Sequence, residues 1–490
     1  MASNLAKIQH IVVVMLENRS FDNMLGFLYA DQGNVPPLNL PVLDPTTFDG
    51  LLPFANSDAF WNPVNPEFFS TPGTAPDKVF ATSGTTGAAP FTVPNPDPNE
   101  LFPNFNFQIF GTQTPAENQK PDMLGFLVDY LIATGNDLPT ALRIMQSYSP
   151  GQVPVLSQLA TNYAVCDRWF ASVPAQTWPN RGFMHTGTAR GQVTNASPFA
   201  YNTETIYEVL QKTGNTWGIY KDTIVPSLTK LQYPRLGLFP FHFHQFAQFQ
   251  VDASNGILPS YSFVEPSFAI EPNDQHSPHN VTDGERFLAK VWSAVSTGAH
   301  WAQTLLVITY DEHGGCYDHV QPPWGAVIPD AASNPGAQGF RFNRFGVRVP
   351  AVVISPLIEP GTVFRSPTGV PFDHTSILAT LRDWLAIPDS AMLSSQRVKA
   401  APTLEFLITR DQPRDTSPAV APAAHPLAML PVANMPATPV NDLQLSMIAA
   451  VESVLQQREL QPQEIEHLRQ RMPTVAHMVQ YFKDVGMTNP

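Results

Sequence analysis

The sequence is poor in cysteine and in charge. Only Cys166 and Cys316 occur among 490 residues, so a framework of several disulfides is excluded, while one bridge or two free thiols stay possible. Charged residues make up 14% of the chain, compared with about a quarter in typical globular proteins. The net charge is −14 and Lys and Arg form no cluster, which argues against binding to nucleic acid or to strongly anionic membranes.

Long hydrophobic runs are also missing. No segment reaches the ~18 consecutive apolar residues of a membrane span, so we expect peripheral membrane contact at most. The run from Ile8 to Leu16 is too short for a signal peptide, is interrupted by His10 and lacks a small-residue cleavage site. We therefore expect a cytoplasmic protein or the mature form of an exported one.

Apolar residues, at 43% of the chain, are sufficient for a large core, and the 50 prolines are about twice the usual share. Short apolar runs typical of buried strands occur at 11–16, near Cys166, at 304–310 and at 349–361. Helical patterns lie at 123–135, 205–214, 284–298 and 375–387. This alternation predicts an α/β fold, with a mostly parallel central sheet and helices on both faces.

Composition divides the chain into a body, a linker and a tail. Residues 1–400 form the body, within which residues 30–120 lack any clear period and are expected to form a loop-rich cap or lid over a site. Residues 401–440 resemble a Pro/Ala-rich linker. Helical periodicity returns in residues 441–490, which we expect to form a helical tail packed on the body.

Two of the predicted strands end in adjacent oxygen ligands, Glu17-Asn18 and Asp311-Glu312. In open α/β sheets, sites form outside the carboxyl ends of the strands. Three carboxylates meeting there require a cation, and all-oxygen ligation suits one divalent ion such as Mg²⁺, Ca²⁺ or Mn²⁺ without excluding Zn²⁺. The alternative is that each pair separately caps a loop or a helix.

Thr177 is a candidate for the group that such a cation activates. It precedes Pro179 at a position where a helix can begin, so its hydroxyl would lie in the positive potential of a helix N-terminus. The simpler interpretation makes Thr177 only the N-cap of that helix.

Histidines gather around the second acidic pair. Imidazoles near a phosphoryl site bind oxygens or protonate a leaving group, although a single histidine is more often structural. The candidates for these roles, including two in an ambiguous phenylalanine-rich stretch, are His276, His279, His374, His242 and His244.

Five segments in order resemble the bacterial and plant phosphoesterase family, which contains non-haemolytic and plant non-specific phospholipases C and an acid phosphatase branch. The segments are ENRSFDNMLG, TWPNR, HSPHNV, TYDEHGGCYDHV and FDHTSIL, and the resemblance covers residues 8 to about 390. It implies an alkaline-phosphatase-like α/β fold in which a metal assists a hydroxyl nucleophile.

The resemblance also implies roles for single residues. Those that correspond to metal ligands, with the nucleophile as a further ligand, are Glu17, Asn18, Asp311, Glu312 and Thr177. Thr177 corresponds to the nucleophile, and it favours the phospholipase C side because the acid phosphatase branch has serine there. His276 corresponds to the family's histidine and would be the general acid, although Ser277 replaces a usual proline. Independently of the resemblance, we expect the substrate-binding residues to be Asn18, His279, His374, His242 and His244.

Three functions follow as hypotheses. The first is a phospholipase C-type phosphodiesterase that works through a phosphothreonine on Thr177. The second is an acid phosphatase for soluble phosphomonoesters. The third, a binding protein that keeps only the fold, should have lost a ligand or the nucleophile, and none of the five positions is lost.

Overall fold

A nine-stranded sheet forms the centre of the computed structural model, which describes residues 3–195, 198–415, 417–423 and 438–488. From edge to edge the strands are β2 (Leu38–Leu40), β13 (Thr362–Phe364), β7 (Ala164–Cys166), β12 (Ala351–Ile354), β11 (Thr304–Tyr310), β1 (His10–Leu16), β10 (Tyr261–Glu265), β8 (Trp217–Lys221) and β9 (Phe243–Gln245).

The sheet is parallel except at one strand. β12 runs antiparallel to both of its neighbours, β11 and β7, and all other pairs are parallel. β1 and β11 are buried along their whole length, because strands covered on both faces need apolar side chains at every position. The predicted mostly parallel sheet is confirmed.

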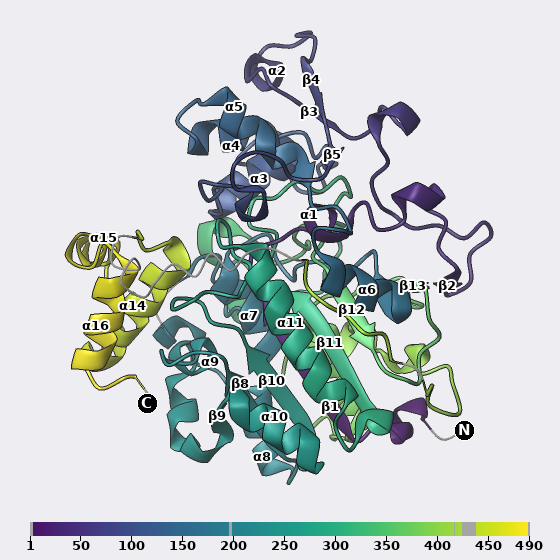
Figure 1. Ribbon diagram of the computed structural model, residues 1–490. Coiled ribbons are helices and arrows are strands. Elements are labelled where there is room, and N and C mark those ends of the chain that lie inside the picture. Colours follow the sequence, from purple (N-terminus) through teal and green to yellow (C-terminus); the bar gives the residue numbers. More distant parts are fainter. Residues whose placement is uncertain (1–2, 196–197, 416, 424–437, 489–490) are drawn as a thin grey trace.

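Helices cover both faces of this sheet (Figure 1). One face carries α6 (Pro154–Asn162), α10 (Phe246–Asn255) and α11 (Val281–Ser296). The other carries α7 (Thr177–Thr186), α8 (Ile206–Lys212) and α12 (Thr375–Trp384). The shorter helices of the body are α1 (Phe21–Leu25), α9 (Leu228–Gln232) and α13 (Gln396–Ala400). The predicted α/β class is therefore confirmed.

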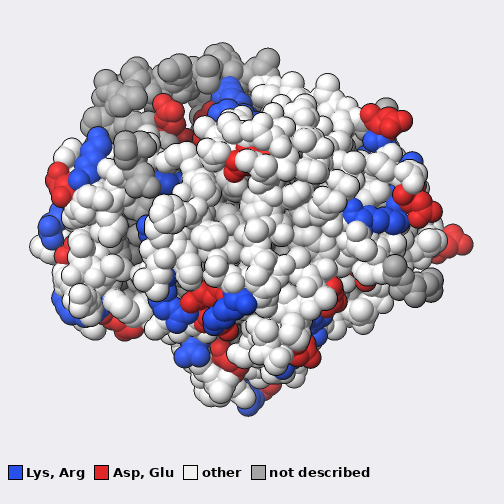
Figure 2. Space-filling view, turned by 90° about the horizontal axis from the view of Figure 1, so that it is seen from below, with Lys and Arg blue, Asp and Glu red and all other residues white. Residues whose placement is uncertain are grey.

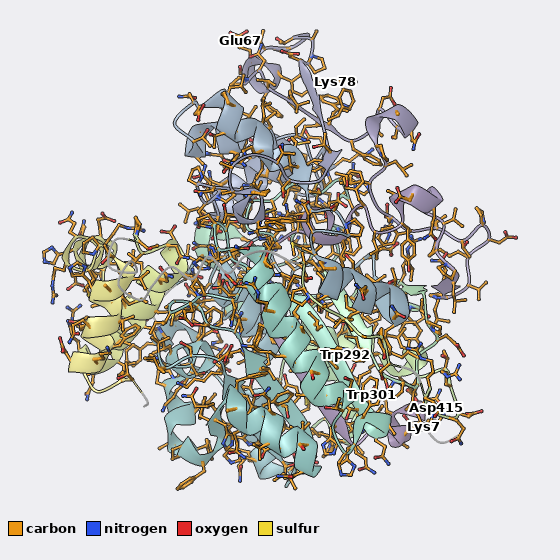
Figure 3. All side chains as sticks on the ribbon, in the orientation of Figure 1. Lys7, Glu67, Lys78, Trp292, Trp301 and Asp415 are labelled. Atoms are coloured by element: carbon orange, nitrogen blue, oxygen red, sulfur yellow. The ribbon has the colours of Figure 1, made fainter. Side chains whose placement is uncertain are left out.

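A separate group of elements lies beyond the carboxyl ends of the strands, at the top of Figure 1. It consists of β3 (Trp61–Pro63), α2 (Glu67–Ser70), β4 (Lys78–Phe80), β5 (Thr82–Ser83), α3 (Phe102–Phe110), α4 (Phe126–Ala133), α5 (Leu138–Ala141) and β6 (Gln146–Ser147). We call these elements the cap. They pack around a second hydrophobic cluster that includes Ile109, Phe126 and Ile144. Figure 3 shows Glu67 and Lys78 at the outer end of the cap and Trp292 and Trp301 in the body.

Three helices form the C-terminal tail: α14 (Asp442–Gln456), α15 (Pro462–Arg471) and α16 (Val475–Asp484). Leu443 and Met447 of α14 are buried in the same hydrophobic cluster as the body. Gln444 Nε2 also donates to the carbonyl of Phe268 over 2.9 Å. The tail therefore shares the core of the body.

The body extends beyond the boundary at residue 400 that composition indicates. Leu404, Leu407 and Ile408 are buried in the main cluster, so the first part of the expected 401–440 linker belongs to the body. Residue 416 and residues 424–437 of this segment lie outside the described part of the chain.

On the surface seen from below, acidic and basic residues are dispersed, mostly toward the edges of the view, and leave a broad uncharged area (Figure 2). In the described part of the chain, no helix has the length and apolar character needed to cross a membrane. Cys166 and Cys316 are both buried and free, so they do not form a disulfide with each other.

Candidate active site

The two acidic pairs meet because their strands are neighbours. β1 and β11 pair in parallel with Leu16 opposite Tyr310, so Glu17-Asn18 and Asp311-Glu312 leave the sheet side by side. The backbone N–H of Asn18 donates to Asp311 Oδ1 over 2.9 Å. The sequence-based expectation that these four residues lie together agrees with this geometry.

The backbones of the two loops come into close contact at Asn18 and Gly314. Asn18 has a left-handed backbone, with φ of 50°. Gly314 has φ of 58°, and a Cβ there would lie 2.4 Å from the carbonyl oxygen of Asn18. Only glycine fits both constraints, which explains the first glycine of the DEHGG segment.

Thr177 is the first residue of α7, and Gln176 occupies the N-cap position. Its hydroxyl donates to Glu17 Oε2 over 3.1 Å and lies 3.5 Å from Asn18 Oδ1. The hydroxyl therefore faces the acidic residues instead of capping its own helix.

Arg181 is a site residue that the sequence did not indicate by itself. It lies four residues after Thr177 and therefore on the same side of α7. Its Nε donates to Glu17 Oε1 over 2.8 Å, and its Nη2 pairs with the same oxygen. The two side chains are 1% and 0% exposed, so this ion pair is fully buried.

The cap contributes Glu100, which was also missed. Glu100 Oε1 accepts a hydrogen bond from Asn18 Nδ2 over 2.5 Å. Asp97 lies close by, 3.7 Å from the ring of His276. The sequence does contain a signal that could have indicated Asp97 and Glu100, because they are the only charged residues between Lys78 and Glu117.

His276 has both ring nitrogens engaged. Nδ1 lies 2.7 Å from the carbonyl oxygen of Ser277, which can only accept, so Nδ1 carries the proton. Nε2 lies 3.0 Å from Asn18 Nδ2 and therefore accepts. Burial lowers the pKa of His276, against the opposing charge of Asp274, and this favours the neutral ring.

His279 is arranged differently. Its Nδ1 lies 2.6 Å from Asp274 Oδ1, and its ring centroid lies 5.9 Å from that of His276. The side chain is 12% exposed. Its Nε2 has no hydrogen-bond partner among the described residues.

His374 lies beneath the second acidic pair. Its Nε2 is 2.6 Å from the carbonyl oxygen of Asp311, and its Nδ1 accepts from Trp169 over 3.5 Å. The side chain is fully buried. It supports the loop that carries Asp311, and neither nitrogen faces outward.

His242 and His244 do not join the other residues. His244 is on β9, the edge strand, which two strands separate from β1. At the usual strand spacing this distance is about 14 Å. His242 stacks on Trp217 and His244 on Tyr220. Their expected place in the site is not supported by this arrangement.

The carboxylates of the site are buried close to one another, which disfavours their charged forms. Burial raises the pKa of Glu17, Glu100 and Glu312 well above the ordinary value, and neighbouring carboxylates raise each of them further. Two buried oxygens, Asp311 Oδ2 and Glu312 Oε1, have no hydrogen-bond partner among the described residues. Such groups need a cation or a proton, so the residues fit a metal.

Two compact groups of acidic residues and histidine can hold a metal ion among the described residues, with ligand atoms within 4.8 Å of one another. One is Asp97, Glu100 and His276 in the site. The other is Asp22, Asp318 and His319, where the guanidinium of Arg348 already pairs with both carboxylates.

Comparison with known proteins gives the family. Residues 8–388 match the sequence pattern described as Phosphoesterase family. The chain belongs to the Phosphoesterase family. It is therefore a hydrolase that acts on phosphoester bonds, and the expected family is confirmed.

Curated relatives of this phosphoesterase include two plant proteins and one bacterial protein. "Non-specific phospholipase C4" of Arabidopsis thaliana is 36% identical over 84% of this chain and 73% of that protein. "Non-specific phospholipase C3" of the same plant is 33% identical over 86% of this chain and 77% of that protein. "Phospholipase C B" of Mycobacterium tuberculosis is 29% identical over 79% of this chain and 74% of that protein.

Comparison with solved structures gives partial matches that cover about half of the phosphoesterase chain. A protein in the alkaline phosphatase superfamily from Vibrio parahaemolyticus has a TM-score of 0.30 and 13% identity, covering 52% of this chain and 66% of that one. A phosphonate monoester hydrolase from Silicibacter pomeroyi has a TM-score of 0.29 and 13% identity, covering 54% of this chain and 73% of that one.

Proposed function

We propose that this phosphoesterase hydrolyses phospholipid diesters in the manner of a phospholipase C, with Thr177 as the nucleophile. The observation that carries the proposal is the hydroxyl of Thr177, aimed at Glu17 and Asn18 inside the buried acidic cluster. The substrate class rests on the relatives, several of which carry the name phospholipase C at 27–36% identity.

One divalent cation would bind beside Thr177 under this proposal. Asp311 and Glu312 each offer a buried oxygen without a partner, and Glu17 and Asn18 offer the oxygens nearest to the hydroxyl. When bound, such a cation would neutralise charge on the phosphoryl oxygens and favour the ionised form of the hydroxyl. All-oxygen ligation suits Mg²⁺, Ca²⁺ or Mn²⁺.

In the first step, Thr177 Oγ1 attacks phosphorus and the bond from phosphorus to the glycerol oxygen breaks. The hydroxyl proton faces Glu17 Oε2, which is the acceptor that the geometry offers. Arg181 holds the other oxygen of Glu17 and fixes its orientation.

In the second step, water attacks the phosphorus of the phosphothreonine. The bond from phosphorus to Thr177 Oγ1 breaks, the proton held by Glu17 returns to Oγ1, one proton of the water passes to Nε2 of His279, and the phosphorylated head group leaves. Splitting the reaction in this way replaces one difficult displacement with two easier ones.

The glycerol oxygen needs a proton as it leaves, and we assign this role to His279. His276 has its proton on Nδ1, which faces a carbonyl, and both nitrogens of His374 are engaged. Nδ1–H of His279 donates to the carboxylate of Asp274, which stabilises the imidazolium form of the ring, and the second proton of that imidazolium, on Nε2, passes to the glycerol oxygen. His279 is also more exposed than His276, and a leaving lipid departs toward solvent.

The test compares substrates with matched leaving groups. Purified protein with Mn²⁺ should hydrolyse phosphatidylcholine and a soluble phosphocholine diester faster than a phosphomonoester, and Thr177→Ala should hydrolyse none of them at a significant rate. A preference for the monoester would replace the proposal with an acid phosphatase. Absence of hydrolysis in the wild type with every divalent metal would leave a binding protein.

A further inference from the structure

We infer that Glu100 of the cap and His276 are positioning residues that fix the orientation of the Asn18 amide. The inference rests on the proposed metal-dependent function, because it concerns which atom of Asn18 faces the cation. The cap thereby completes the site from the side opposite the sheet.

The amide nitrogen of Asn18 has two hydrogens, and both are used. One goes to Glu100 Oε1 over 2.5 Å and the other to His276 Nε2 over 3.0 Å. The carbonyl oxygen is left to face Thr177, whose hydroxyl lies 3.5 Å away.

The orientation has chemical consequences because an amide has two different ends. The oxygen carries lone pairs and is a ligand for a hard cation, whereas the NH₂ group has none to offer. If Asn18 turned by half a rotation, it would present hydrogens to the cation and an oxygen to the carboxylate of Glu100. Glu100 and His276 therefore hold the NH₂ group of Asn18 on one side and turn its carbonyl oxygen toward the cation on the other.

His276 is fixed as an acceptor by its own neighbour. The carbonyl oxygen of Ser277 takes the proton on Nδ1, so Nε2 presents a lone pair to Asn18. Glu100 accepts through Oε1, a carboxyl oxygen with lone pairs of its own. Neither residue depends on the other for this property, so each restrains the amide independently.

Arg19 ties together the two segments that carry these acceptors. Its Nη1 donates to the carbonyl of Val93, in the stretch that leads to Glu100, over 2.7 Å. Its Nε donates to the carbonyl of Gln275, next to His276, over 2.7 Å. Arg19 directly follows Asn18 in sequence. One short motif therefore supplies the proposed ligand, Asn18, and also the arginine that binds the segments next to Glu100 and His276.

The test measures Mn²⁺ affinity, from the electron paramagnetic resonance of free Mn²⁺, in the full chain. Loss of a hydrogen-bond partner of a metal ligand typically weakens binding by about 10–100-fold. We expect a loss of this size for Glu100→Ala. Glu100→Gln is the matched variant, and it should lose far less, because the glutamine oxygen can accept the same hydrogen bond without the charge.

A second pair of variants separates orientation from charge. In an Asn18→Asp background both ends of the side chain are oxygens, so orientation no longer matters. Adding Glu100→Ala to this background removes only a negative charge near the cation, so Mn²⁺ affinity should fall by much less than it does in the wild-type background. A loss equal to that in the wild-type background would overturn the inference.

Other outcomes are equally decisive. If the wild type binds Mn²⁺ tightly and Glu100→Ala binds it as well, the inference is wrong and the proposed metal site stands. If the wild type binds no divalent metal, the inference and the proposed metal site are both wrong. Two Mn²⁺ ions per chain, one of them lost in Glu100→Ala, would make Glu100 a ligand instead. If Glu100→Ala does not fold, His276→Ala removes the other acceptor and carries the same prediction.

Discussion

The hydroxyl of Thr177 donates to Glu17 Oε2 over 3.1 Å, although 160 positions separate the two residues in sequence. Two unrelated parts of the fold create this contact. β1 delivers Glu17 at its carboxyl end, and the first turn of α7 delivers Thr177. The proposed nucleophile is therefore held by regular elements on both sides, as catalytic geometry requires.

The buried pair of Arg181 and Glu17 should contribute strongly to stability. Arg181→Met leaves the Glu17 carboxylate buried and unpaired, so we expect the free energy of unfolding to fall by about 3–5 kcal/mol in urea titrations. The control is Arg235→Met, which breaks the more exposed pair with Glu208 and should cost less than about 1 kcal/mol. Equal effects of the two substitutions would show that the buried pair has no special weight.

Removal of the metal should stop turnover. Chelation should inactivate the protein, and Asp311→Asn and Glu312→Gln should lower metal content and activity together, because each replaces a charged ligand oxygen. Elemental analysis alongside turnover is the measurement. Asp383→Asn, which changes a partly exposed carboxylate of α12, serves as the control and should retain metal. Full activity in metal-free protein would contradict the proposal.

His279 should matter only when the leaving group needs a proton. We expect His279→Ala to slow a diester with an alkyl alcohol far more than a p-nitrophenyl ester, since p-nitrophenolate leaves unprotonated and acid catalysis contributes about 10²–10⁴-fold where it operates. His276→Ala should slow both substrates alike. The comparison uses kcat on the two esters, and equal losses for His279→Ala would remove its assignment.

His319 should make stability depend on pH. Burial alone would lower its pKa, but the carboxylate of Asp22 and hydrogen bonds to Asp22 and Asp49 raise the pKa to about 9, against the charge of Arg348. The folded state thus binds the proton more tightly than the unfolded chain. This stabilisation is complete below pH 6.5 and is lost as pH rises through 9.

The size of this effect follows from the shift in pKa. We expect the free energy of unfolding to fall by about 3 kcal/mol more in the wild type than in His319→Gln between pH 6.5 and pH 9.5, measured by urea unfolding. The control is His467→Gln, which changes an exposed histidine of the tail and should keep the wild-type dependence. A parallel fall in His319→Gln would assign the dependence to other groups.

The sequence predicted the central strands of the sheet because their residues are almost all apolar. Residues 11–16 and 304–310 are continuously apolar and end abruptly in polar side chains, and they form neighbouring strands. β8 (Trp217–Lys221) and β10 (Tyr261–Glu265) were missed, since WGIYK and YSFVE mix apolar and polar residues. The antiparallel direction of β12 has no sequence signal, because direction depends on the path of the connecting loop.

The site was predictable only where local pattern determines position. Glu17, Asn18, Asp311 and Glu312 follow directly from strand ends. Glu100 could not be placed, because its approach to Asn18 depends on the three-dimensional course of the cap, which has no periodicity to read. His242 and His244 look like site residues by composition, yet aromatic stacking at the sheet edge accounts for them.

The stereochemical course at phosphorus tests the central claim most directly. A chiral phosphorothioate analogue of the diester is hydrolysed in isotopically labelled water, and the configuration of the product is read by ³¹P NMR. Two successive in-line displacements, first by Thr177 and then by water, each invert the centre, so the account predicts overall retention. Overall inversion would mean that water attacks the diester directly, and the role of Thr177 as nucleophile would be contradicted.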